Sequence, residues 1–132
     1  MTALAFGFTK LVVKDLNALE EFYCDVFGMK RVHRVTTDEH QYALEEVILT
    51  LGGKSDSHAL VITRYRHKPC PPAGAAWTGF VVPDIDTTLS TVQKHGGRIE
   101  VPVHENREYA VRAAIAADPE GHVIEVIQVI RA

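Results

Sequence analysis

A single carboxylate, Glu125, is the most distinctive candidate for chemistry in this 132-residue sequence. It lies in a predicted closing strand over residues 122–130, where successive side chains point to opposite faces of a sheet. Glu125 shares its face with Val123, Ile127 and Val129, so the strand carries one charge in an apolar stripe. An ionisable group in that setting is either a functional acid or base or a salt-bridged structural carboxylate.

A second isolated charge is Lys10, in a predicted strand over residues 4–13. Alternation places Lys10 on the same face as Phe8 and Val12, again among apolar side chains. An ion pair between Lys10 and Glu125 would relieve the cost of burying either charge. Lys10 and Glu125 are therefore the two candidate catalytic groups.

The remaining metal-ligating residue types are scattered. No two of the seven histidines have the i, i+2 spacing that would let both chelate from one strand face. His40, on a turn next to Tyr42, is the histidine expected to reach the rim of the site if a metal centre has been rebuilt. Cys24 and Cys70 form neither a CxxC pair nor a disulfide framework, which indicates reduced thiols and a cytoplasmic protein.

The amino-acid composition argues against some classes of binding partner. Hydrophobic residues make up 46% and charged residues 23% of the chain, as in a globular domain, and the formal net charge is −3. The acidic balance argues against a nucleic-acid partner. No apolar run approaches the roughly 18 residues that span a membrane, and the N-terminus lacks the basic residues of a signal peptide.

Hydrophobic periodicity predicts one strand, one helix and three further strands in the first half of the chain. The helix begins at Asp15 or Asn17 and ends at Gly28, and the strands cover residues 4–13, 29–35, 42–51 and 58–65. Residues 66–76 contain three prolines and a glycine, which predicts a linker. The same order then returns, with a helix after Asp84 and strands over residues 77–82, 98–101, 109–117 and 122–130.

The two halves also match residue by residue. The segment Val13-Lys14-Asp15-Leu16 corresponds to Val82-Pro83-Asp84-Ile85 at an offset of 69, and the same offset places Gly28 on Gly97. One offset that relates strand, helix start and helix end together indicates an internal duplication. Because two copies are too few for a solenoid, they must pack on each other or on a partner chain.

Three motifs resemble the vicinal-oxygen-chelate superfamily, which includes glyoxalase I, bleomycin-resistance proteins, extradiol dioxygenases and methylmalonyl-CoA epimerase. They are the opening Asp15-Leu16 with Phe22-Tyr23 and Phe27-Gly28-Met29, the restart Phe80-Val81-Val82-Pro83-Asp84-Ile85-Asp86, and the closing Asp118-Pro119-Glu120-Gly121-His122-Val123-Ile124-Glu125. The resemblance implies an α+β fold of two tandem β-α-β-β-β modules that form a cupped mixed sheet. Residues 1–132 are then one such domain, with module one at 4–65, a linker at 66–76 and module two at 77–130. The resemblance also implies a homodimer, although the linker would allow a compact monomer.

The resemblance further implies a divalent metal ion, which is Zn, Ni, Fe or Mn. Four side chains would hold it, one from the first strand and one from the fourth strand of each module. The first-strand positions fall on Phe8 and Trp77, and the fourth-strand positions on Val61 or Ile62 and on Glu125. Only Glu125 can ligate a metal, so we expect no metal cofactor. The position where glutathione-handling members carry an arginine falls on Val12, which argues against glyoxalase I activity.

Most of the residues expected to line the cup are aromatic or apolar. They are Phe8, Val12, Ile62, Trp77, Gly79, Arg112 and Glu125, with Arg112 or Arg64 as further possible partners of Glu125. The sequence therefore favours a protein that binds a small apolar or aromatic molecule without a metal. The alternatives are a metal-dependent lyase, isomerase or dioxygenase with non-standard ligands around Glu125, a metal-free enzyme using Glu125 and Lys10, and a dimerisation module without a ligand.

Overall fold

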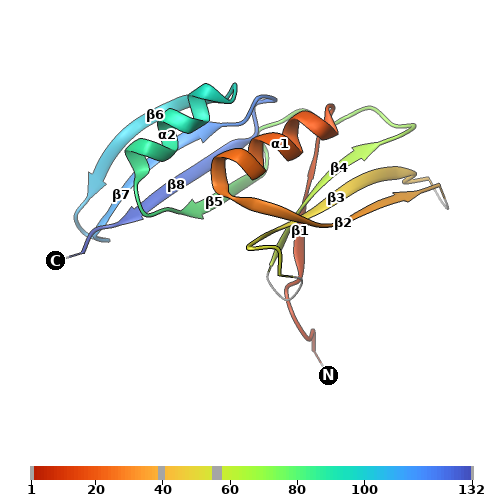
Figure 1. The fold of residues 1–132 in the computed structure, drawn as a ribbon, viewed down its shortest axis with the longest axis horizontal. Coiled ribbons are helices and arrows are strands. Elements are labelled where there is room, and N and C mark those ends of the chain that lie inside the picture. The colour runs from red at the N-terminus through yellow and green to blue at the C-terminus, as the bar shows by residue number, and fades with distance from the viewer. Residues whose placement is uncertain (1, 39–40, 55–57, 132) are drawn as a thin grey trace. The chain divides into compact units, whose positions relative to one another are not determined.

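The computed structural model describes residues 2–38, 41–54 and 58–131. The chain divides into two compact units, Met1–Pro71 and Pro72–Ala132, and the division falls within the proline-rich segment 66–76 (Figure 1). The first unit contains β1 (Phe8–Val12), α1 (Leu16–Phe27), β2 (Met29–Thr37), β3 (Leu44–Leu51) and β4 (Ala59–Tyr65). The second contains β5 (Trp77–Val81), α2 (Ile85–Lys94), β6 (Arg98–Asn106), β7 (Val111–Ala117) and β8 (Val123–Val129).

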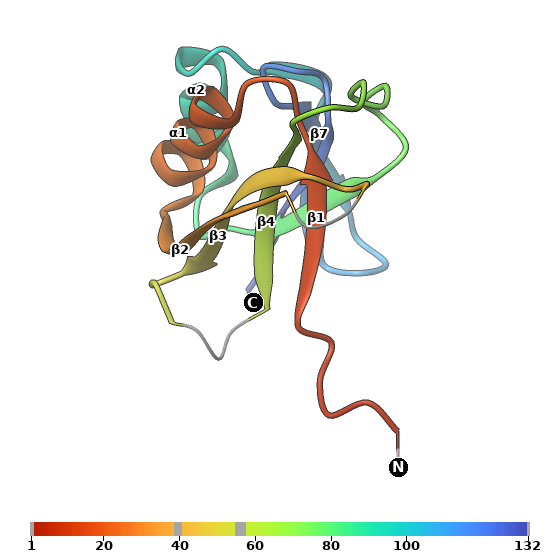
Figure 2. The ribbon, with the colours of Figure 1, turned by 90° about the vertical axis from the view of Figure 1, so that its right-hand side faces the viewer.

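Each unit forms one four-stranded mixed sheet with the same topology. The strand order is β1-β4-β3-β2 in the first unit, where α1 lies beside the sheet (Figure 2), and β5-β8-β7-β6 in the second. The first and last strands of each unit pair in parallel, and the other neighbours are antiparallel. The predicted α+β fold of two β-α-β-β-β modules is confirmed.

The two helices begin in the same way. Asp15 accepts a hydrogen bond from the backbone N–H of Ala18 at 3.0 Å, and Asp84 accepts one from Thr87 at 3.2 Å, so both aspartates are N-caps. Helix α1 therefore begins at Asp15 rather than at Asn17. It ends at Gly28, whose backbone adopts the left-handed conformation with φ 73°.

Each helix covers one face of its own sheet. The buried side of α1, formed by Leu16, Leu19, Phe22 and Tyr23, packs against β3 and β4. The strand side chains beneath α1 are almost completely buried: Leu11, Val13, Val47, Leu49, Leu60 and Ile62. This burial supplies the core of the first unit, and it leaves the opposite side of the sheet for the alternate residues.

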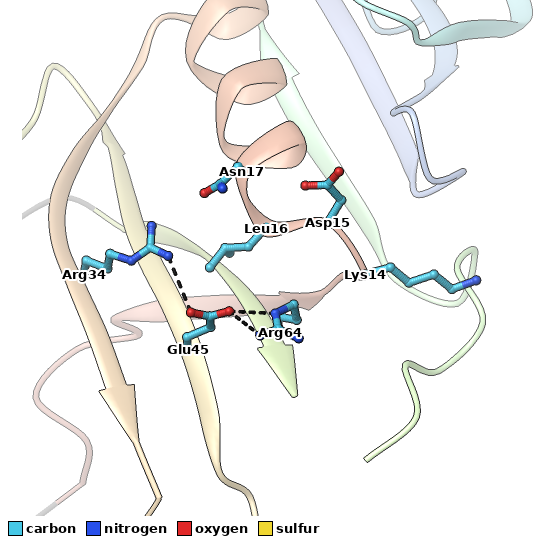
Figure 3. A pocket seen from close by; sticks show the side chains of 7 residues that line it. All are labelled: Lys14, Asp15, Leu16, Asn17, Arg34, Glu45 and Arg64. Atoms are coloured by element: carbon cyan, nitrogen blue, oxygen red, sulfur yellow. Dashed lines mark hydrogen bonds and ion pairs between the residues drawn. The ribbon is translucent and has the colours of Figure 1, made fainter. Parts of the chain in front are cut away.

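A group of charged side chains lies where α1 begins. Glu45 of β3 bonds the Arg64 guanidinium of β4, with an Nε–Oε1 distance of 2.7 Å, and lies 3.5 Å from Arg34 of β2 (Figure 3). The three side chains border a hollow of about 340 Å³ together with Lys14, Asp15, Leu16 and Asn17. Glu45 thus links three adjacent strands on the face that α1 covers.

The closing motif forms a buried turn immediately before β8. Asp118 is completely buried, and its Oδ1 accepts the backbone N–H groups of Glu120 and His122 at 2.9 and 3.0 Å. The His122 ring lies 2.9 Å from the other carboxylate oxygen. Gly121 takes φ 93°, a conformation that glycine adopts without strain. The motif therefore has a structural role, because it fixes the start of the strand that carries Glu125.

Neither helix in the described part of the chain has the length and apolar character needed to cross a bilayer.

Replacing Asp118 by alanine should lower the free energy of unfolding by about 2–4 kcal/mol, because it leaves buried His122 and two backbone N–H groups without their acceptor. Urea denaturation followed by circular dichroism measures the loss. Asp38→Ala removes an exposed carboxylate paired with Arg66 and should cost less than about 0.5 kcal/mol. Equal losses in the two variants would contradict the role given to the turn.

The Glu45 cluster should make stability depend on pH. The hydrogen bond from Arg64 holds the pKa of Glu45 below its usual range, with a smaller contribution from the charge of Arg34. Because the folded-state pKa is lowered, the stabilisation is present above the unfolded pKa of about 4.3 and is lost as pH falls through the folded-state value.

The difference in unfolding free energy between the wild type and Glu45→Gln should therefore be below about 1 kcal/mol at neutral pH, because these side chains are partly solvated. It should shrink in acid. Denaturation curves at neutral and acidic pH measure it, and Glu108→Gln, on an exposed turn, controls for the loss of one charge. A difference that stays constant through the acid range would show that the ion pairs do not stabilise the fold.

Candidate functional site

Contacts with α2 show which face of the second sheet each strand residue occupies. Arg112 of β7 bonds Asp86 of α2 at 3.2 Å, and the side-chain Oε1 of Gln128 in β8 accepts the backbone N–H of Ile85 at 2.8 Å. Gln128 lies three residues after Glu125, so alternation places Glu125 on the other side of the sheet. We call this side, opposite the helix of its own unit, the helix-distant face.

The helix-distant face of the second unit is largely apolar around Glu125. Glu125 pairs with Gly79 on one side and with Ile115 on the other. Trp77 is 55% exposed and Val81 is also exposed. A Cβ atom added to Gly79 would lie no closer than 4.0 Å to other heavy atoms, so the glycine leaves open space between Trp77 and Val81. Among the described residues Glu125 has no hydrogen-bond or ion-pair partner.

The helix-distant face of the first unit carries Phe8, Lys10 and Val12. Phe8 is 57% exposed. The Lys10 Nζ lies 2.9 Å from Oε1 of Glu46 in β3 and 5.9 Å from the centre of the Phe8 ring. Thr63 of β4 donates its hydroxyl to the same Glu46 oxygen at 2.9 Å. This face therefore contains an ion pair beside an exposed aromatic ring.

Glu46 is a member of this face that the sequence prediction missed. Two adjacent glutamates, Glu45 and Glu46, stand in β3, so alternation requires one of them on each face. Glu45 bonds arginines beneath α1, whereas Glu46 is directed to the helix-distant face and is only 8% exposed. The adjacent pair was a usable signal, but only the strand register shows that Glu46 meets Lys10 and Thr63.

Three residues expected in the cup or beside Glu125 lie elsewhere. Ile62 pairs with Leu11 and Val47 and is completely buried on the face that α1 covers. Arg64 bonds Glu45 on that face, and Arg112 bonds Asp86 of α2. Neither arginine therefore pairs with Glu125 as predicted. Lys10 forms its ion pair with Glu46. Phe8, Lys10, Val12, Trp77, Gly79 and Glu125 do occupy the helix-distant faces.

The strand registers decide which residues stand at the four metal-ligand positions. Gly79 pairs with Glu125, and Lys10, which is two residues after Phe8 as Gly79 is after Trp77, pairs with Val61. Val61, rather than Ile62, is therefore the counterpart of Glu125. The four side chains are a phenyl ring, an indole, an isopropyl group and one carboxylate, and only the last is a metal ligand.

Other donors do not complete the set in the described ranges, where no three histidine, cysteine or acidic side chains are grouped as a metal would require. His40 lies outside the described residues. The residues that the structure describes consequently do not fit the divalent metal that the superfamily implies.

Cys24 has the surroundings of a packing residue. It lies on α1, where partial burial and the nearby carboxylates of Glu20 and Asp25 raise the pKa of its thiol. A raised pKa leaves little of the nucleophilic thiolate at neutral pH. Cys24 is therefore not a candidate nucleophile.

Comparison with known proteins places this geometry in a family. A "Probable lactoylglutathione lyase" from Vibrio parahaemolyticus is 27% identical over 122 residues, which cover 91% of this chain and 87% of that protein. A glyoxalase family protein from Bacillus cereus superposes with a TM-score of 0.85 at 17% identity and covers 99% of this chain and 97% of its own.

Glyoxalase I from Zea mays superposes with a TM-score of 0.75 at 20% identity over 95% of this chain, which spans 44% of the maize chain. These structural similarities support the fold seen in both units. The family model of the Glyoxalase/Bleomycin resistance protein/Dioxygenase superfamily matches residues 5–126, and the chain belongs to this superfamily.

Proposed function

We propose that this protein binds a small apolar or aromatic molecule on its helix-distant faces and does so without a divalent metal. The residues proposed for binding are Phe8 and Val12 on the face of the first unit, and Trp77 and Gly79, with Glu125 as a polar group, on the face of the second. It is thus a glyoxalase/bleomycin-resistance-like protein whose metal site is degenerate. This role corresponds to sequestering or carrying a ligand rather than to metal-assisted turnover.

The observation that carries the proposal is that an aromatic ring occupies both first-strand metal positions. Phe8 and Trp77 are each more than half exposed, at 57% and 55%. Aromatic rings bury a large apolar area and stack on flat ligands, and exposing them to water has a cost that a bound ligand would remove. The same exposed apolar side chains also suit a homodimer, as the family resemblance implied.

The alternative is a metal-dependent lyase, isomerase or dioxygenase with non-standard ligands around Glu125. The name given to the Vibrio relative favours this class. This alternative lacks metal ligands: Glu125 is the only donor at the four positions, and Glu46, the carboxylate beside Lys10, is already bonded to Lys10 and Thr63. The metal-free proposal therefore accounts for more of the residues.

Binding of a neutral aromatic probe tests the proposal. 4-Fluorobenzamide titrated with protein should show saturable broadening of its ¹⁹F NMR signal. Phe8→Ala should weaken binding to the face of the first unit, and Trp77→Ala should weaken binding to the face of the second. Each loss should be about fivefold to tenfold, as expected for one aromatic contact of about 1–1.4 kcal/mol.

Tyr109→Ala provides the matched control, because Tyr109 is an exposed aromatic residue in the turn before β7. Its affinity should equal that of the wild type. Two results would reject the proposed function: absence of saturable binding, as expected of a dimerisation module without a ligand, or the same affinity in all three alanine variants and the wild type.

A further inference from the structure

In the Lys10–Glu46 ion pair on the helix-distant face of the first unit, the lysine is more exposed to solvent than the glutamate. Glu46 is the buried partner, with its side chain 11% exposed, whereas the side chain of Lys10 is 39% exposed. Thr63 supplies a second hydrogen bond to the same carboxylate oxygen that Lys10 contacts. A ligand that approaches this face therefore meets the ammonium group more readily than the carboxylate.

The ammonium group of Lys10 also has N–H donors that Glu46 does not use. A lysine carries three N–H donors, and Glu46 is its one hydrogen-bonding or ion-pair partner within the described residues. Lys10 Nζ stands 5.9 Å from the centre of the exposed Phe8 ring. An aromatic ring laid against Phe8 would thus hold a substituent next to Nζ.

The charged side chains near Lys10 indicate what kind of substituent the ligand carries. Arg64 and Arg34 point to the face covered by α1, where Glu45 pairs with them, so they add no positive charge beside the Lys10–Glu46 pair. A single ammonium suits a singly charged, planar anion such as a carboxylate. Phosphate binding instead relies on several donors, often arginine forks or a helix N-terminus.

We propose that the ligand of this face is an aromatic carboxylic acid, with its carboxylate on Lys10 Nζ and its ring against Phe8. The inference rests on the proposed function, since it names the ligand class of the same surface. Glu46 and Thr63 act as positioning residues, because their hydrogen bonds hold the lysine beside the ring. Binding is reversible and involves no covalent step.

Two probes of the same shape and different charge test the assignment. 4-Fluorobenzoate and 4-fluorobenzamide differ in whether the substituent is an anion, and ¹⁹F NMR titrations give both affinities. The wild type should prefer the benzoate by about threefold to fivefold, as expected for one partly solvated ion pair. Lys10→Met should abolish this preference, and raised salt should reduce it in the wild type.

Control variants distinguish the loss of the Lys10 charge from damage to the fold. Lys10→Met leaves Glu46 buried without its cation, so the double variant Lys10→Met/Glu46→Gln is measured as well and should also show no preference. Lys94→Met removes a lysine from the last turn of α2 and should retain the wild-type preference.

The outcomes distinguish the two proposals. If the benzamide binds as tightly as the benzoate in the wild type, or if the preference survives in Lys10→Met, the ligand class is wrong while the proposed function stands. If the benzamide shows no saturable binding, the proposed function itself is wrong, whatever the affinity of the benzoate.

Discussion

One helix covers one face of each four-stranded sheet, and this constraint determines what every strand residue can do. Because side chains alternate along a strand, a residue either enters the core beneath the helix or remains on the helix-distant face. Leu11 and Ile62 belong to the first class, and Phe8 and Lys10 to the second. The candidate site is formed by the second class, because the apolar members of the first class are committed to the core that stabilises the unit.

The duplicated register makes the divergence of the two units visible. Lys10 and Gly79 occupy equivalent positions in the two sheets, as do Val61 and Glu125. At this pair of positions each unit therefore carries one charge, on the first strand in the first unit and on the last strand in the second. In the first unit the charge is compensated by Glu46 from β3. In the second unit Glu125 lies among Gly79, Ile115 and exposed apolar side chains. The fold has been kept while the polar groups have changed.

Local signals in the sequence predicted most of the fold. The cap Asp84 and the helix end at Gly28 depend on nearby backbone groups, so their residue types were sufficient, whereas the start of α1 was left open between Asp15 and Asn17. The candidate site was harder, because it depends on the register between strands. Parity within β1, β5 and β8 gave the correct faces, but Ile62 was assigned to the wrong side of β4. Glu46 was missed because its partners come from two other strands.

Metal content measures the metal-independence of the site most directly. The purified protein is incubated with Zn, Ni, Fe or Mn ions in turn, dialysed, and analysed for bound metal by mass spectrometry, beside Glu125→Gln. Because phenyl, indole and isopropyl groups occupy three of the four ligand positions, we expect far less than one ion per chain and no difference between the two proteins. One tightly held ion per chain that is lost in Glu125→Gln would contradict metal-free binding and establish a metal centre built around Glu125.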